Sequence, residues 1–445
     1  MKKLNILYLF LASSLFGFAQ EIVEKEQKTS FNLNEAISYA KIHNRNIQNA
    51  VAGIQASEEQ KWEAISIGLP QISGKVDYTA NLKTPIEGDP TNPADPINFF
   101  FPANTLTPSL TVTQLIFDGS YIVGLQASKV FLDISKNYKD KTDNEIEQIV
   151  VNAYMTALLT DESILILEKN IKNIEDNLKE ATAVVANGLA EEESVEQLQL
   201  TLTNLENSMR NYEVLADVSN GYVKLLLGID SETTITLSDN LENLISEYVT
   251  LESEFEQNSV FNNIDYKIAV NETESKELLY KLEKAKYLPS ISAFLNTNAQ
   301  GLNEDFGGLF SSDQDWLTST SAGVSLSIPI FTSFNIRSQK RRAKINWEIS
   351  ENTLKDTEQQ LKLDLKKVKS EYILAAETYE NRKQNLTLAE KIERKNSVKF
   401  SEGMASSIDL RTVQVQLYDS QQQYIESIID VINKKVELKN LLNIK

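Results

Sequence analysis

The sequence predicts a mostly α-helical protein with a β-barrel part, built from two internal repeats that each supply two membrane strands and long coiled-coil helices. Three observations carry this prediction: residues that recur at a spacing of half the chain, long segments without proline or glycine, and four segments in which apolar and polar residues alternate. Few architectures satisfy all three, because strands and helices follow each other in the same order in both halves.

The second half of the chain repeats the first. The spacing of the matching residues is close to half of the 445 residues, which indicates an internal duplication and not an array of short modules. We place the first repeat at residues 20–228 and the second at 229–445. The matches are Asn44 with Asn263, Leu69-Pro70 with Leu288-Pro289, Gly188 with Gly403, Ala190 with Ala405, and Lys224 with Lys439.

Residues 1–19 are typical of a secretory signal peptide. Lys2 and Lys3 precede an apolar run from Leu4 to Phe16, and small residues flank a cleavage point before Gln20. The run is shorter than the ~20 residues that a membrane-spanning helix needs, although an uncleaved N-terminal membrane helix is the alternative. The mature protein is therefore expected to leave the cytoplasm.

The composition argues against an enzyme. The chain has no cysteine and a single histidine, His43, which leaves no histidine or cysteine cluster for a metal and makes a Ser-His-Asp triad improbable. No phosphate-binding loop or dinucleotide fingerprint is present, so we expect no catalytic, cofactor or metal site. The formal charge of −19 disfavours nucleic acid as a partner.

Most of the chain is expected to be helical. Five segments without proline or glycine are rich in Glu, Lys, Leu, Gln and Ala, which favour helices; they cover 125–187, 189–220, 229–288, 333–402 and 404–445. The four long helices are placed at about 121–187, 191–227, 334–402 and 406–442. A helix of this length would extend roughly 100 Å, too long for a compact globule.

Apolar residues in two of these helices recur every seven residues. This period is typical of helices that supercoil around neighbours. The series are Leu410, Leu417, Tyr424, Val431 and Leu438 in the second repeat, and Val195, Leu202, Met209, Ala216 and Val223 in the first.

Four segments alternate apolar and polar residues with period two, at about 71–82, 109–117, 290–298 and 321–331. Their length is that of a membrane-barrel strand. The polar loops between them, about 83–107 and 300–318, are expected outside the cell, and aromatic residues there are candidates for an interfacial girdle or for packing within the loop; they are Phe99, Phe100, Phe101 and Trp316.

Four strands cannot close a membrane barrel. Each unpaired backbone group in hydrocarbon costs several kcal/mol, and spanning barrels have about eight strands or more. The edge strands must therefore pair between chains, and three copies in a cyclic assembly would give twelve strands.

The motifs at the repeat boundaries resemble those of the TolC-type outer-membrane efflux family over nearly the whole mature chain. The resemblance rests on Phe31–Ala40, His43–Ile47, Leu69–Ser73, Leu115–Gly119 and Ile328–Thr332. It implies a homotrimer with a 12-stranded barrel in the outer membrane of a Gram-negative bacterium and a 12-helix α-barrel in the periplasm. The implied function is passive conduction of substrates from a periplasmic adaptor (membrane fusion protein) and an inner-membrane RND or ABC transporter to the exterior.

The resemblance also implies where the tunnel tip lies. Family members turn between long helices at a Gly-x-x-[Ser/Thr] stretch, which here matches Gly188-Leu189-Ala190-Glu191 and Gly403-Met404-Ala405-Ser406. A lone glycine suits such a helix end on its own merits. Docking of the adaptor on Gly188, Leu189, Ala190, Gly403, Met404, Ala405 and Ser406 is the added expectation.

Gate residues follow the second glycine in the family. Six residues beyond Gly403 the expected aspartate is Asp409, the next expected aspartate is replaced by Thr412, and Ser194 stands at the matching place in the first repeat. A ring of three carboxylates would favour cations. The alternative is that Asp409, like Glu191, Glu192 and Glu193, only stabilises a helix N-terminus.

Two questions stay open at the level of sequence. A secreted or periplasmic coiled-coil scaffold or adhesion protein would also explain the seven-residue period, but not four strands placed symmetrically in two repeats. Within the channel interpretation, small-molecule efflux and protein secretion share one architecture, and the transported substrate leaves no signature in the sequence.

Overall fold

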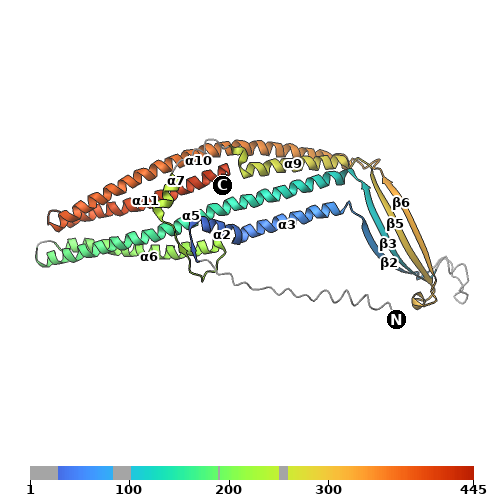
Figure 1. Ribbon diagram of the computed structural model, residues 1–445, viewed down its shortest axis with the longest axis horizontal. Coiled ribbons are helices and arrows are strands. Elements are labelled where there is room, and N and C mark those ends of the chain that lie inside the picture. Colours follow the sequence, from blue (N-terminus) through green and yellow to red (C-terminus); the bar gives the residue numbers. More distant parts are fainter. Residues whose placement is uncertain (1–28, 84–101, 189–190, 250–258, 445) are drawn as a thin grey trace.

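The computed structural model describes residues 29–83, 102–188, 191–249 and 259–444. The chain is elongated, with a β-sheet at one end and two helical hairpin turns at the other (Figure 1). Two helices, α5 (Gly119–Ala186, 68 residues) and α10 (Asn335–Ser401, 67 residues), run along most of this length. The predicted signal peptide and residues 84–101 with their three phenylalanines lie outside the described residues.

Apart from α2, the remaining long elements follow the same order in both repeats. In the first, α2 (Leu33–His43), α3 (Arg45–Ser66), β2 (Gln71–Ala80) and β3 (Asn104–Phe117) precede α5, and α6 (Glu193–Leu227) follows it. In the second, α9 (Ile264–Ala285), β5 (Ser290–Asn303) and β6 (Trp316–Ser327) precede α10, and α11 (Ser407–Leu442) follows it. This order confirms the predicted mostly helical fold class with an antiparallel strand part.

The four long strands form one antiparallel sheet in the order β2-β3-β5-β6. The register aligns the apolar positions of all four strands: Ile72 lies opposite Val112, Val112 opposite Leu295, and Leu295 opposite Ala322. Because side chains alternate between the faces of a sheet, one face is mostly apolar and the other mostly polar. Ile72 and Val76 are exposed by 70% and 67%, so nothing in the described chain covers the apolar face.

The strand boundaries differ from the predicted ones. β3 begins at Asn104, five residues before the predicted start, because Pro108 interrupts only one of its two ladders. Neither Thr107 nor Pro108 has a partner in β5, but both still pair with β2. β6 is shifted toward its N-terminus, from the predicted 321–331 to Trp316–Ser327. It ends where its partner strand begins, since Ser327 pairs with Ser290.

The segment after the first repeat is not one long helix, which corrects the prediction for residues 229–288. It contains β4 (Thr236–Leu237), α7 (Leu241–Val249) and a 3-10 turn, η2 (Val260–Asn262), before α9 begins. β4 pairs in parallel with β1 (Ser30–Phe31). The β-branched residues at 233–236 disfavour a helix, although no glycine or proline marks the change.

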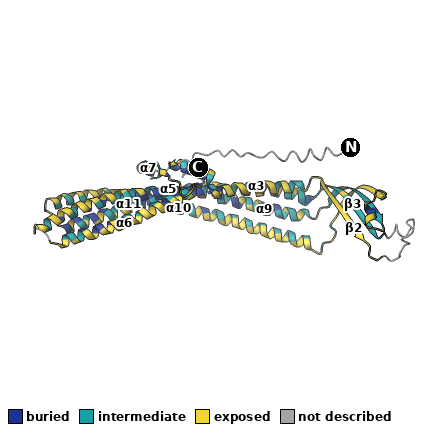
Figure 2. Cartoon of the chain, turned by 90° about the horizontal axis from the view of Figure 1, so that it is seen from below, coloured by how far each residue is buried: buried dark blue, intermediate teal, exposed yellow. Residues whose placement is uncertain are grey.

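These small elements pack on the middle of the long helices, where the largest buried core lies (Figure 2). Tyr154 of α5 is fully buried there, and its hydroxyl donates to the carbonyl of Phe31 at 2.9 Å. Tyr372 of α10 is also fully buried and donates to the carbonyls of Tyr248 and Val249 at 3.1 and 3.3 Å. Each repeat therefore holds its short elements through one buried tyrosine.

The recurring asparagines perform the same structural role twice. Asn44 caps α3 by accepting from the Asn46 backbone N–H, and its amide donates to the carbonyl of Leu226 at 2.8 Å. In the second repeat, Asn263 caps α9 and its amide donates to the carbonyl of Leu441 at 2.9 Å. Both side chains are buried, so each joins the start of one helix to the end of another.

The seven-residue series is mostly buried in α11, where Leu410, Val431 and Leu438 have no exposed surface. α5 is the one helix in the described ranges that is long and apolar enough to cross a membrane by composition alone. Half of its most apolar window is buried against the rest of the chain, as expected of a core helix.

Candidate tip and tunnel-entrance site

Two helix–helix turns meet at the end of the molecule opposite the sheet (Figure 1). Gly403 ends α10 with φ of 71°, its N–H donates to Phe400, and the N–H of Met404 donates to Lys399 at 2.7 Å. These two bonds form a Schellman motif, which requires a left-handed residue that glycine supplies without strain. Gly188 has the same φ of 71° and the corresponding bond to Val185.

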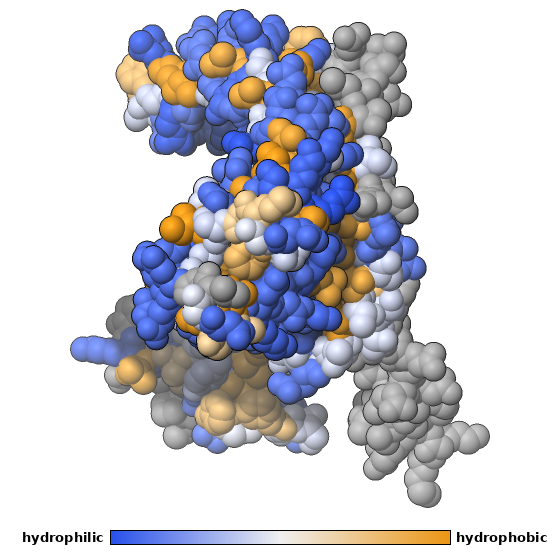
Figure 3. Space-filling model, turned by 90° about the vertical axis from the view of Figure 1, so that its left-hand side faces the viewer, coloured by the Kyte–Doolittle hydropathy of each residue, from blue (hydrophilic) through white to orange (hydrophobic). Residues whose placement is uncertain are grey.

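Neither glycine is needed for space. A Cβ atom at Gly188 or at Gly403 would meet no atom within 4 Å. Met404 is 72% exposed, Ile408 is exposed as well, and the end of the molecule is otherwise largely hydrophilic (Figure 3). Leu189 and Ala190, the other docking candidates of the first repeat, lie outside the described residues.

The second turn is closed by a reciprocal pair of hydrogen bonds. The Ser406 hydroxyl accepts from the backbone N–H of Asp409, while the Asp409 carboxylate accepts from the Ser406 backbone N–H at 3.0 Å and hydroxyl at 2.7 Å. This is a capping box. The bonds from Ser406 hold the pKa of the exposed Asp409 carboxyl below its usual value, with Lys399 adding a smaller attraction.

The structure therefore joins a docking candidate, Ser406, to the gate candidate, Asp409. Thr412 lies one turn further along α11, exposed, with its hydroxyl donating to the carbonyl of Ile408 at 2.8 Å. Ser194 lies in the first turn of α6, whose N-cap residue, Glu192, makes no side-chain cap. The first repeat thus lacks the closed turn of the second.

The start of α11 is linked to α6 by polar contacts that the sequence did not predict. Arg411 reaches Gln197 at 3.5 Å, and its Nε is buried without a partner among the described residues. One turn on, Gln414 is 1% exposed and neither of its side-chain polar atoms has a partner there. Gln421, one heptad later, accepts from Asn170 of α5 at 2.9 Å.

A sequence signal for these contacts exists. Gln414 and Gln421 are each four residues after a member of the seven-residue series, Leu410 and Leu417, and such places also face the partner helix. Polar residues there fix the register of the helices at a cost in stability. They show that the tip half of the bundle has a partly polar interior.

Comparison with known proteins supports the same architecture. A model of the family described as Outer membrane efflux protein matches residues 262–443, which cover most of the second repeat. No curated protein matches the chain.

Several solved structures have a similar fold. The crystal structure of CusC is 14% identical, with a TM-score of 0.76 and 92% of each chain covered. The outer membrane protein VceC from Vibrio cholerae is 15% identical, with a TM-score of 0.72 and coverage of 92% of this chain and 95% of that one. The CmeC outer membrane channel of Campylobacter jejuni is 15% identical, with a TM-score of 0.73 and coverage of 92% of this chain and 85% of that one.

The family match and the fold converge. The second repeat matches the family model, and the first repeat has its long elements in the same order. The family consists of outer-membrane channels of Gram-negative bacteria and not of enzymes. The second repeat of this protein matches the Outer membrane efflux protein family, and the chain as a whole has the fold of solved outer-membrane channels.

Proposed function

We propose that this protein is the outer-membrane duct of a tripartite efflux or type I secretion system. It conducts substrates passively from a periplasmic adaptor and an inner-membrane RND or ABC transporter to the exterior. Residues 1–19 direct its export, and residues 20–228 and 229–445 supply two similar halves of each protomer. The duct is a homotrimer in contact with outer-membrane lipid.

The sheet is the observation that carries this proposal. β2 pairs only with β3, and β6 only with β5, within the described chain, so both edges have free backbone groups. None of the described residues covers the apolar face either. Hydrocarbon suits such a face, but free edges are not tolerated there, so β2 of one protomer pairs with β6 of the next. Three copies make a closed twelve-stranded barrel.

Fractionation and conductance test the duct. The purified protein should partition into the outer membrane, run as a trimer in detergent and produce discrete conductance steps in a planar bilayer. A monomer that stays in the periplasmic fraction and produces no conductance would instead support a coiled-coil scaffold.

The tip turns are the proposed adaptor contact. Gly403→Trp places a large side chain in the open space beside the turn, and the left-handed φ adds strain of roughly 1–2 kcal/mol. We expect drug export to be lost while the trimer persists. Glu402→Trp, at the neighbouring position, controls for bulk at the tip, and unchanged drug resistance in Gly403→Trp would contradict the docking proposal.

Asp409 is the proposed gate residue. Asp409→Asn removes the charge but keeps an oxygen that accepts from Ser406, so the turn stays closed while the ring of charge disappears. Single-channel recording should then show weaker cation preference and weaker block by divalent cations. If both stay as in the wild type, Asp409 acts only as a helix cap.

A further inference from the structure

A cluster of positive charge interrupts an otherwise acidic chain where α10 leaves the sheet. Five of the eight residues from 337 to 344 are basic and none is acidic, in a protein with a net charge of −19. The members are Arg337, Lys340, Arg341, Arg342 and Lys344. The matching stretch at the start of α5, residues 120–131, has one charged residue, Lys129. The cluster is thus specific to the second repeat.

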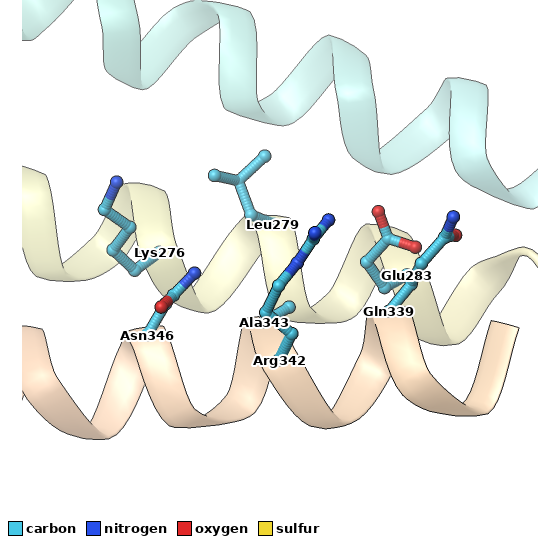
Figure 4. Close-up of a pocket in the computed structure, with 7 residues that line it drawn as sticks. All are labelled: Lys276, Leu279, Glu283, Gln339, Arg342, Ala343 and Asn346. Atoms are coloured by element: carbon cyan, nitrogen blue, oxygen red, sulfur yellow. The ribbon is translucent and has the colours of Figure 1, made fainter. Parts of the chain in front are cut away.

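Some residues of this cluster face α9, and others lie on the opposite side of α10. Gln339, Arg342, Ala343 and Asn346 line a groove shared with Lys276, Leu279 and Glu283 of α9 (Figure 4). Arg337 and Arg341 each lie two positions from Gln339, which is about 200° around a helix of 3.6 residues per turn. They are exposed on the side away from α9, and neither forms an ion pair with a described carboxylate; Arg337 lies 5.9 Å from the Phe334 ring.

The opposite edge of the protomer carries the complementary charge. α3 packs on α5 through Ser57, whose hydroxyl lies 2.6 Å from that of Ser135, and through Ile65, whose carbonyl accepts from Tyr121. Glu59 and Glu63 lie two positions from these contacts and therefore face away from α5. Both are exposed and without an ion pair in the described chain.

The two acidic and the two basic residues lie at similar distances from the helix ends that adjoin the sheet. Glu63 and Glu59 are three and seven residues before the end of α3, and Arg337 and Arg341 are two and six residues after the start of α10. At 1.5 Å per residue, Glu63 and Arg337 differ by only about 1.5 Å in their distance from these helix ends, and so do Glu59 and Arg341. Both helix ends adjoin the sheet, and they run in opposite directions (Figure 1).

The internal repeat supplies a copy of this contact within one chain. The spacing of 219 residues that relates Asn44 to Asn263 relates Glu59 to Leu278 and Glu63 to Leu282. The spacing of 214 that relates Phe117 to Phe331 relates Ala127 to Arg341 and Val123 to Arg337.

These apolar equivalents meet each other where α5 packs on α9. Leu278 and Ala127 belong to one buried cluster, against which Val123 packs, and a Cβ at Gly124 would lie 3.8 Å from Leu282. The same positions on α10 and α3 are therefore placed to face each other between protomers.

From this equivalence we infer that Arg341 and Arg337 of one protomer form ion pairs with Glu59 and Glu63 of the partner subunit. The inference rests on the proposed cyclic trimer, in which α10 of one protomer lies beside α3 of the next. The pairs replace, between chains, the apolar contact that α5 and α9 make within a chain. They leave each exported monomer with charged, soluble edges until it meets another copy.

Charge reversal with rescue tests the pairing. Arg337→Glu with Arg341→Glu, or Glu59→Arg with Glu63→Arg, sets like charges opposite each other and should raise trimer dissociation in detergent at least about tenfold. Combining all four substitutions should restore the trimer. Arg342→Glu, one position from Arg341 but in the α9 groove, is the matched control and should leave dissociation near the wild-type value.

Cross-linking tests the geometry independently of stability. Because the chain has no cysteine, Glu59→Cys with Arg341→Cys introduces the only two thiols, at opposite edges of a protomer. A short bis-maleimide should link them into covalent dimers and closed trimers, whereas Glu59→Cys with Arg342→Cys should link poorly.

The outcomes separate the two proposals. A wild-type protein that is not a trimer would overturn the proposed assembly. A wild-type trimer in which the four substitutions fail to rescue and the thiols fail to link would overturn the ion pairs alone. Loss of co-purified anionic phospholipid from the Arg337→Glu and Arg341→Glu variant, with the trimer intact, would also overturn them and assign the cluster to lipid headgroups.

Discussion

The two repeats make the same hydrogen bonds between helices inside a protomer, but they differ at the helix ends beside the sheet and at the tip. Asn44 and Asn263 make the same two hydrogen bonds in the two repeats. At the start of the long helices, by contrast, Asp118 caps α5 through Ser120 and Tyr121, whereas α10 begins after Ser333 and Phe334 with φ of 48° and 65°. Duplication thus preserved these internal joints, in each of which one asparagine connects the start of one helix to the end of another.

The tips differ in the same way. α11 begins with the capping box of Ser406 and Asp409, whereas the N-cap residue of α6, Glu192, makes no side-chain cap. The ends of the repeats are the places that contact other molecules in the proposed assembly. Divergence there lets one chain supply two different surfaces from a common frame.

The largest expected effect tests whether the shared joints are equivalent. Asn44→Ala and Asn263→Ala each remove a helix cap and leave a carbonyl without its donor: that of Leu226, which is buried, or that of Leu441, which is partly buried. We expect each to lower the free energy of unfolding by about 2–4 kcal/mol, since a cap contributes ~1 and an unsatisfied buried group 1–3. Chemical denaturation in detergent measures both.

Asn44→Ser and Asn263→Ser are the matched controls, because serine keeps the cap and loses only the amide donor. They should recover roughly 1 kcal/mol of the loss. A large loss at one asparagine and none at the other would show that the joints are not equivalent.

An intermediate effect is expected at the helix ends beside these joints. Gly228 ends α6 and Asn443 ends α11, both left-handed. A Cβ at Gly228 would lie 2.7 Å from the His43 carbonyl oxygen, so Gly228→Asn should destabilise by about 1–3 kcal/mol. Asn443→Gly loses the hydrogen bonds with Asn144 and Asn262 but relieves the left-handed strain, so its net effect should stay near 1 kcal/mol or below.

Thermal unfolding of the two swaps in parallel gives this comparison directly. Equal destabilisation by Gly228→Asn and Asn443→Gly would contradict the close approach of α6 to His43.

The smallest effect concerns the tips and depends on pH. The folded pKa of Asp409 is lowered, so the carboxylate stabilises the first turn of α11 above the ordinary aspartate pKa of about 4, and this is lost as pH falls through the lowered value. Amide exchange at residues 407–410 should therefore lose protection in acid, while residues 194–197 of α6 should show no matching change. Persistence of the α11 effect in Ser406→Ala would exclude the capping box as its cause.

The sequence predicted the parts of the fold that depend on local chemistry. Gly188 and Gly403 mark both helix turns because few other residues tolerate a left-handed φ, and alternation from Ile72 onward marks a strand with two different faces. The short pairing of Ser30–Phe31 with Thr236–Leu237 was not predicted, because two-residue strands more than 200 residues apart depend on tertiary contacts. The shift of β6 likewise depends on its partner.

The candidate site divides in the same way. The turn at Gly403 and the cap at Ser406 and Asp409 follow from neighbouring residues and were within reach of the sequence. The contact of Arg411 with Gln197 and the burial of Gln414 arise between helices, where local patterns carry little information. The roles of Asp409, Thr412 and Ser194 in gating stay predictions.

The uninterrupted length of α5 has a mechanical consequence. Its buried Tyr154 lies near its midpoint, so the helix has two arms of nearly equal length, each roughly 50 Å at 1.5 Å per residue. A tilt of about 5° around Tyr154 moves the two ends of the helix by about 4 Å each, in opposite directions. Widening of the tip by rigid tilting would therefore push on the sheet, and a sheet closed into a barrel resists that push. The helix must bend between Tyr154 and the tip for its two ends to move independently.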